Sequence, residues 1–165
     1  GGTVLQGPGC LNYSLILKAG PKTSFSNIRK TNCNVMEFNR QTLERVLKKP
    51  VTIEGYTDLS IDGLKCSGNA QRRTKNYVLF HGTFLCHLDI NLIDQLLKIP
   101  KKQPAYRQNR GHLDFLTNLN VSAGKIKSEL ARTWKAKQPL RLLPLTLIDR
   151  LVQEKYEKPL WNFKF

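Results

Sequence analysis

The sequence predicts an α+β fold, and its 165 residues are the length of one domain. Segments with the composition of strands gather before residue 90, and segments with helical periodicity both interrupt and follow them. The sequence shows no internal repeat and no low-complexity linker, and its 40% of apolar residues can form a sizeable core. A mixed α/β arrangement within a single domain is the alternative that these patterns leave open.

Short strands are predicted from runs of β-branched and aromatic residues. They are expected at residues 3–6, 12–18, 51–54, 59–61 and 77–87. The dipeptide Asp62-Gly63 is typical of a two-residue hairpin turn. After that turn, we expect Lys65 to lead into a loop of small residues.

Helices are predicted where apolar residues recur every three or four positions and where a capping residue precedes such a run. We expect one helix from near Phe25, capped by Ser24, and others at residues 34–49, 91–99, 122–134 and 146–156. Pro50 and Pro100 close two of these helices, because proline cannot continue a helix.

The charge of the chain indicates an acidic partner. Lysine and arginine number 27 against 12 acidic residues, which gives a net charge of +15. Nucleic acid is the first partner to consider, but the basic residues are scattered and form no recognisable nucleic-acid-reading motif. An acidic protein substrate fits the charge as well, so we do not expect nucleic acid as the partner. A non-enzymatic basic module that binds RNA or an acidic protein remains an alternative.

The cysteines and the first residues of the chain indicate the cellular compartment in which the protein is expected. Cys10, Cys33, Cys66 and Cys86 are widely spaced and form neither a C-x-x-C pair nor a zinc-like set. We therefore expect reduced thiols in a cytoplasmic protein. No apolar run approaches the roughly 20 residues of a membrane span, so no membrane partner is expected. The chain starts at Gly1 without methionine or a leader, and we expect a natural N-terminal part to be missing.

Lys65 is the first candidate for site chemistry, because it stands beside Ser67, Gly68 and Ala70. Glycine has no Cβ, so a ligand can approach its backbone closely. A lysine held there would polarise a carboxylate and neutralise a phosphate. An exposed lysine after a β-turn is the alternative. Cys66 is a weaker candidate for a nucleophile, because strand alternation would point it away from the lysine's face.

Two further groups are ambiguous when each is taken alone. His81, Gly82 and Thr83 either line a pocket or form a half-buried strand with a bulge at the glycine. Asp58 either approaches a metal or a nucleotide hydroxyl, or caps a turn.

Two other groups of residues also allow two interpretations each. Two glycine-containing segments are Gly1-Gly2-Thr3 and Gly7-Pro8-Gly9. Either they offer backbone N–H groups to an anion, or they form the turns at the ends of a hairpin strand. His112 and Asp114, near two arginines, either receive a partner protein or belong to a solvated loop.

These groups occur together and in order, and in that order they resemble the lipoate-protein ligase family. The family's glycine-rich strand start and its Gly-x-x-Asn-aromatic-Ser/Thr turn resemble Gly1 through Ser14. Its Lys-x-Ser-Gly-x-Ala motif resembles Asp58 through Ala70, and its His-Gly-Thr matches residues 81–83. The resemblance covers most of residues 1–90.

The resemblance implies a mixed, mostly antiparallel sheet flanked by helices, as in class II biotin and lipoyl ligase catalytic domains. Residues 1–165 would be a single catalytic domain that lacks its N-terminal strands and has no accessory C-terminal domain. Lipoate or octanoate would react with ATP and Mg²⁺ to an acyl-adenylate, and a lysine of a lipoyl carrier domain would then take the acyl group. That carrier would be an acidic protein, such as a dehydrogenase E2 lipoyl domain or a glycine-cleavage H protein, and the enzyme would be a monomer.

The resemblance also assigns site residues. Lys65 would be catalytic and would contact both the acyl carbonyl and the phosphate, with Asp58 near the nucleotide; no metal ligand is predicted. The residues that would bind substrate are Gly1, Gly2, Thr3, Gln6, Ser67, Gly68, Ala70, His81, Gly82 and Thr83.

Departures from the family pattern keep a second activity open. Gln6 stands where many members have histidine, and Thr57 replaces the usual asparagine before Asp58. The runner-up is an octanoyl- or lipoyl-transferase on the same fold, which takes its acyl group from a carrier protein, commonly through a cysteine thioester. We expect that cysteine just before Asp58, but residues 50–57 contain none, which favours the ligase. A biotin ligase fits the Lys-x-Ser-Gly-x-Ala form less well.

Overall fold

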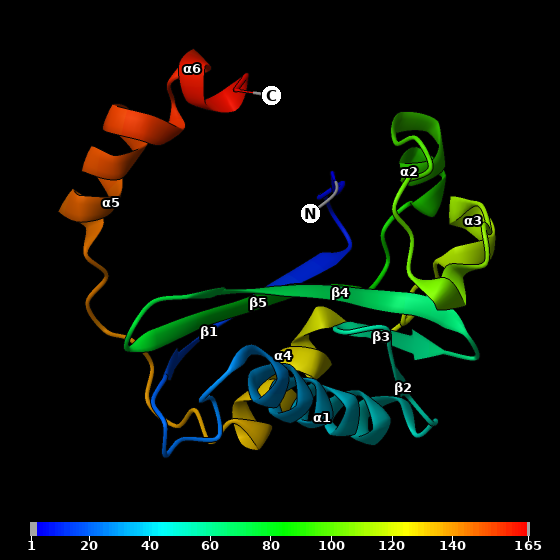
Figure 1. The fold of residues 1–165 in the computed structure, drawn as a ribbon, viewed down its shortest axis with the longest axis horizontal. Coiled ribbons are helices and arrows are strands. Elements are labelled where there is room, and N and C mark those ends of the chain that lie inside the picture. Colours follow the sequence, from blue (N-terminus) through cyan, green and yellow to red (C-terminus); the bar gives the residue numbers. More distant parts are fainter. Residues whose placement is uncertain (1–2, 165) are drawn as a thin grey trace. The chain divides into compact units, whose positions relative to one another are not determined.

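The structure is a computed structural model that describes residues 3–164 (Figure 1). The chain divides between Lys135 and Ala136 into two compact units. The strands of the first unit are β1 (Cys10–Lys18), β2 (Thr52–Glu54), β3 (Asp58–Ile61), β4 (Leu64–Arg73) and β5 (Tyr77–Leu85). Its helices are α1 (Ile28–Leu47), α2 (Ile90–Leu96), the 3-10 turn η1 (Ala105–Arg107), α3 (His112–Phe115) and α4 (Ala123–Thr133).

The strands form one sheet in the order β1-β5-β4-β3-β2, and every pair in it is antiparallel. This sheet with its helices confirms the α+β prediction. The predicted hairpin joins β3 to β4, because Ile61 pairs with Leu64 across a two-residue turn. Asp62 and Gly63 have φ angles of 52° and 75°, and this turn type requires positive φ at both positions.

The prediction of a loop after Lys65 is wrong, because the residues that follow it belong to β4. β4 pairs with β3 on one side and with β5 on the other, so its backbone groups are satisfied by two neighbours. Gly68 and Ala70 have a low intrinsic preference for strands. Pairing on both sides outweighs that preference.

The predicted strand at residues 3–6 is also wrong, since this segment belongs to no strand. Side-chain contacts hold it instead, as Gln6 Nε2 donates to Thr83 Oγ1 of β5 at 3.1 Å. A turn then leads into β1, where the backbone N–H of Cys10 donates to the carbonyl of Gly7 at 3.1 Å.

The core lies between one face of the sheet and helices α1 and α4 (Figure 1). Met36 and Leu43 of α1, Ile126 of α4, and Phe80 and Phe84 of β5 are fully buried there. The two helices cover only this face. The opposite face is left to the N-terminal segment and to α2 and α3 (Figure 1).

The first helix begins at Ile28, later than the predicted start near Phe25. The side chain of Asn27 caps it and accepts a backbone N–H of the first turn at 2.8 Å. Arg73 of β4 donates to the carbonyl of Phe25 at 2.8 Å, which holds the preceding segment as a turn. Ser122 caps α4 as predicted.

The second unit holds α5 (Leu145–Leu151), the π-helical turn η2 (Val152–Tyr156) and α6 (Pro159–Asn162). The helix predicted at residues 146–156 corresponds to α5 and η2. Trp161 of α6 packs edge-on against Tyr156, with ring centroids 5.8 Å apart. Across residues 3–164, no helix combines the length and the apolar composition needed to cross a membrane.

Candidate active site

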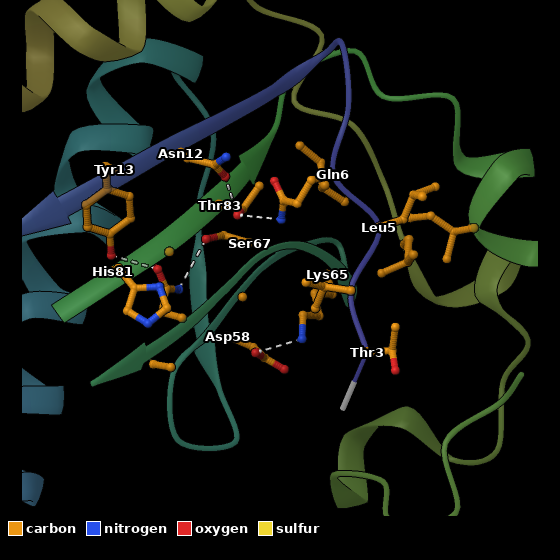
Figure 2. Close-up of a pocket in the computed structure, with 18 of the residues that line it drawn as sticks. Thr3, Leu5, Gln6, Asn12, Tyr13, Asp58, Lys65, Ser67, His81 and Thr83 are labelled. Carbon is orange, nitrogen blue, oxygen red and sulfur yellow. Dashed lines mark hydrogen bonds and ion pairs between the residues drawn. The ribbon is translucent and has the colours of Figure 1, made fainter. Parts of the chain in front are cut away.

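A cleft of about 780 Å³ lies on the open face of the sheet, between β1, β5 and β4 and the N-terminal segment (Figure 2). The predicted site residues that the structure describes all line it. They are Thr3, Gln6, Asp58, Lys65, Ser67, Gly68, Ala70, His81, Gly82 and Thr83. Gly1 and Gly2, which were also predicted, lie outside the described residues. The structure therefore brings together groups that are up to 80 positions apart in the sequence.

Lys65 is held in the cleft by an ion pair (Figure 2). Its Nζ lies 2.8 Å from Oδ1 of Asp58, and the side chains are 26% and 16% exposed. Tyr106 donates from its hydroxyl to the other carboxylate oxygen of Asp58 at 2.7 Å. Burial and the adjacent carboxylate raise the pKa of Tyr106, so the phenol stays a donor. Asp58 thus orients the lysine and is itself fixed.

A β-bulge determines which side chains of β4 face the cleft. The pairing register between β3 and β4 shifts between Leu59 and Ser60. An extra residue changes the alternation of a strand, so Lys65 and Gly68, three positions apart, both line the cleft. A Cβ on Gly68 would lie 3.3 Å from Nζ of Lys65. Glycine at this position keeps space around the ammonium group.

Cys66 points away from the cleft, as strand alternation predicted. Its side chain is fully buried, and its thiol donates to the carbonyl of Leu59 at 3.3 Å. Burial raises the pKa of this thiol to about 12. The thiol therefore carries little thiolate at neutral pH and is a poor nucleophile.

Hydrogen bonds link the polar side of the cleft to three parts of the chain (Figure 2). Thr83 accepts from Gln6 and donates to Oδ1 of Asn12 on β1 at 2.6 Å. His81 pairs in register with Ser14 of β1 and with Ala70 of β4. This row of three residues forms the part of the cleft floor nearest the end of β4.

A partly buried hydrogen-bond chain that runs from α1 to the wall of the cleft was not predicted from the sequence. Asn39 of α1 donates to the hydroxyl of Tyr13 at 2.6 Å, and that hydroxyl donates to Oδ1 of Asn69 at 2.6 Å. The amide of Asn69 donates in turn to the carbonyl of Thr57 at 2.7 Å. The chain connects the core helix to the residue before Asp58.

Gly82 makes room for this chain, because it lies opposite Asn69 in the register of β4 and β5. A Cβ on Gly82 would lie 1.7 Å from Oδ1 of Asn69 and 2.9 Å from a ring carbon of Tyr13. The glycine is therefore required by a neighbouring side chain. The bulge that the sequence suggested at Gly82 is wrong, since β5 pairs there without a register shift.

The other end of the cleft is apolar. Leu5, Leu85, Ile93, Leu97 and Leu116 line it, and none of them was predicted from the sequence. They come from four separate parts of the chain, with only Ile93 and Leu97 close together in sequence, at α2, so no local motif marks the set. Such a surface suits a hydrocarbon chain.

His112 lies at this end of the cleft in α3, so the alternative of a solvated loop is wrong for this residue. The alternative of a partner site at His112 and Asp114 stays a prediction. The imidazole is buried, with Nε2 3.1 Å from the carbonyl of Leu97. Arg107 is also buried, and its guanidinium lies 4.6 Å from the ring centroid of Phe115. These contacts hold α2 and α3 together beside the cleft.

The described residues offer no metal centre. Within residues 3–164, no group of three or more histidine, cysteine or acidic side chains is placed to hold a metal ion. Asp58 has one oxygen on Lys65 and the other on Tyr106. Each oxygen of this carboxylate therefore already has one donor from a neighbouring side chain.

Comparison with known protein families decides the family. The model of the lipoyl protein ligase A/B catalytic domain matches residues 1–133. The chain belongs to this family. The lipoate-ligase resemblance expected from the ordered motifs is confirmed.

The curated relatives of this lipoyl-ligase-family chain include both activities. An octanoyltransferase LipM of Geobacillus kaustophilus is 28% identical over 93% of this chain and 68% of its own length. Another, from Anoxybacillus flavithermus, is 31% identical over 66% of this chain, and the match spans 44% of that protein. A lipoate-protein ligase 1 of Staphylococcus aureus is 24% identical over 99% of this chain and 51% of its own length.

Solved structures share the fold. A bipartite lipoate protein ligase from Thermoplasma acidophilum, studied with its E2 lipoyl domain, matches 98% of this chain and 67% of its own, with a TM-score of 0.79 and 21% identity. A lipoate-protein ligase A bound with ATP matches 93% of this chain and 65% of its own, with a TM-score of 0.77 and 19% identity. The class II ligase-like fold expected from the resemblance is thereby confirmed.

Proposed function

We propose that this protein is a lipoate-protein ligase that activates lipoate or octanoate with ATP and transfers the acyl group to a lysine of a lipoyl carrier domain. The observation that carries the proposal is the oriented ammonium group of Lys65 in a cleft with one polar and one apolar end. We infer that residues 1–165 act as one catalytic domain. We also infer a monomer and a cytoplasmic location, which agrees with four unpaired cysteines.

The first step is formation of the acyl-adenylate. A carboxylate oxygen of lipoate attacks the α-phosphorus of ATP; the new O–P bond forms while the bond to the β-phosphate oxygen breaks, and pyrophosphate leaves with that electron pair. Lys65 stabilises the negative charge that grows on the phosphate and acyl oxygens, because its ammonium is already fixed by Asp58. The apolar end of the cleft holds the acyl chain and keeps water from it.

The second step is amide formation. The uncharged amine of the carrier lysine attacks the acyl carbonyl, the C–N bond forms, and the acyl–phosphate C–O bond breaks to release AMP. The amine nitrogen loses a proton to water, and the electron pair of the broken C–O bond leaves with AMP. Lys65 again faces the carbonyl oxygen, which carries the charge of the tetrahedral intermediate. Ser67, Gly68 and Ala70 form the floor over which the acyl group lies.

Magnesium has no dedicated place in this proposal. The described residues do not form an acidic cluster that would hold it, and both oxygens of Asp58 already contact Lys65 or Tyr106. Magnesium would accompany ATP as part of the substrate, since it binds readily through phosphate oxygens and water.

The second candidate is an octanoyl- or lipoyl-transferase, and the octanoyltransferases among the relatives favour it. A cysteine acyl-enzyme would need a reactive thiol at the cleft. No cysteine is among the described residues that line the cleft, and Cys66, next to Lys65, is buried. These observations support the ligase over the transferase.

The two activities differ in their acyl donor. Purified protein is incubated with an apo-lipoyl domain and either lipoate plus ATP or an octanoyl carrier protein without ATP, and the modified domain is detected by mass spectrometry. The proposal predicts modification with lipoate and ATP only. Modification from the octanoyl carrier protein alone, with a thioester trapped on a cysteine, would contradict it.

A further inference from the structure

Acidic residues are missing from two long stretches of the chain. Residues 1–36 contain no aspartate or glutamate, and neither do residues 63–88. These stretches contribute basic side chains that are exposed and have no carboxylate partner among the ion pairs of residues 3–164. They are Lys18, Lys22, Arg29, Lys30, Arg72 and Lys75.

The fold brings these six cations to one end of the first unit, where β4 turns into β5; we call this the basic end. Lys18, the last residue of β1, pairs with Tyr77, the first residue of β5. The side chain of Gln71 on β4 donates to the carbonyl of Ile28 at 3.1 Å, which ties the start of α1 to the same place. Residues from three elements thus form one cationic surface.

The start of α1 adds to this positive potential. Arg29 and Lys30 lie in its first turn, which contains no acidic residue. The N-terminus of a helix carries a partial positive charge, so acidic side chains would stabilise it and cations do the opposite. This arrangement becomes favourable when an anionic surface lies against it.

The basic end begins directly at the rim of the cleft. The row formed by Ser14, His81 and Ala70 lines the cleft. The next row along the same face consists of Ile16 and Leu79, which are 77% and 38% exposed, with Arg72 beside Leu79. Successive rows on one face of a sheet are about 7 Å apart.

We propose that the basic end is the docking surface for the acceptor protein, and that it binds a small domain through an acidic face. This rests on the proposed function, in which a protein lysine must reach the acyl group in the cleft. Exposed apolar side chains rimmed by cations are typical of a surface that binds an acidic protein. Uncompensated charge of one sign also steers such a partner toward the site before contact.

The test separates docking from chemistry. A triple charge reversal at the basic end, Lys22→Glu, Arg72→Glu and Lys75→Glu, is compared with a reversal of equal charge at exposed lysines elsewhere, Lys49→Glu, Lys125→Glu and Lys127→Glu. Two quantities are measured for each: the KM for an acidic apo-lipoyl domain, and the lipoate-dependent exchange of pyrophosphate into ATP, which needs no acceptor. Circular dichroism and thermal unfolding confirm that both variants fold.

We expect the basic-end variant to raise the KM for the lipoyl domain about tenfold and to leave the exchange reaction within about twofold of the parent. We expect its KM to depend less on salt between about 50 and 300 mM, because the lost attraction is screened by ions. The control reversal should change the KM by less than about twofold. Equal effects of the two reversals would overturn the proposal.

Direct binding keeps the proposal testable if the enzyme shows neither ligase nor transferase activity. The apo-lipoyl domain is titrated into the parent and both variants by calorimetry. Binding that the basic-end reversal alone weakens supports the docking surface even if the proposed chemistry fails. If the parent binds an RNA oligonucleotide through the basic end and shows no binding of the lipoyl domain, the surface is a nucleic-acid site and the proposal is wrong.

Discussion

Position 82 requires glycine because two other side chains occupy the space beside it. It lies against Asn69 and Tyr13, which belong to the hydrogen-bond chain that reaches Thr57 and so precedes Asp58. A methyl group at position 82 must displace that chain. We expect that displacement to disturb the ion pair of Asp58 with Lys65, which orients the lysine.

We predict that Gly82→Ala destabilises the protein by about 1–3 kcal/mol, the usual cost of overpacking, and lowers the rate of lipoyl transfer. The double variant with Asn69→Ala should recover part of the stability, because the nearest clash, with Oδ1 of Asn69, is gone. Urea unfolding of both variants and of Asn69→Ala alone gives the coupling energy. Strictly additive effects would show that the two residues do not compete for the same space.

Thiol reactivity tests whether any cysteine is available for acyl transfer. Cys33 is exposed, whereas Cys66 is buried with its pKa raised to about 12. At pH 8 we expect Cys33 to react with a disulfide reagent within seconds to minutes and Cys66 only after unfolding, because the thiolate is the reactive form. Mass mapping identifies the modified residue, and Cys33→Ser removes the fast phase. Rapid modification of Cys66 in the folded protein would support acyl transfer through a cysteine thioester.

The individual site residues differ in how far the sequence predicts them. Lys65, His81 and Thr83 belong to ordered motifs, so the sequence predicts them as site residues. Tyr13 and Asn69 interact across 56 positions in sequence, so their contact exists only once the strand register is fixed. No local pattern contains that information.

At the scale of the elements, β4 shows where local sequence misleads. Its small residues predict a loop, yet they form a central strand because β3 and β5 pair with it on both sides. The small residues are there because the strand forms the cleft floor. The hairpin at Asp62-Gly63 and the cap at Ser122 were predicted correctly, because each depends on a few adjacent residues.

The contact between α1 and α4 should make stability depend on pH. Hydrogen bonds from Arg132 and from Arg45 of α1 hold the pKa of Glu129 below its usual value. A carboxyl with a lowered folded-state pKa stabilises the protein above its unfolded pKa, about 4.3, and that contribution disappears as the pH falls through the folded value.

We therefore expect Glu129→Gln to be less stable than the parent at pH 7, with a difference that shrinks as the pH falls from about 4.3 toward 3. Thermal unfolding between pH 7 and pH 3 measures it. Glu157→Gln, in the second unit, is the control and should leave the melting temperature unchanged. A difference for Glu129→Gln that stays constant over the whole range would contradict the assignment.

For the whole molecule, the sequence shows the excess of basic residues but not where the fold brings them together on the surface. The acid-free stretches can be counted directly, whereas their meeting at the basic end depends on the pairing of β1 with β5 and on the contact of α1 with β4. The fold class followed from the order of strand-like and helix-like segments. The single catalytic domain over residues 1–165 stays a prediction.

The proposed ligase activity depends on acyl activation in the Lys65 cleft. The most direct measurement is the lipoate-dependent exchange of labelled pyrophosphate into ATP by the purified protein. We expect exchange by the parent and by Lys98→Ala, and a loss of at least about 100-fold in Lys65→Ala and Lys65→Met, which remove the ammonium group but keep the fold by circular dichroism. Undiminished exchange in folded Lys65 variants, or no exchange by the parent with either lipoate or octanoate, would contradict the central claim.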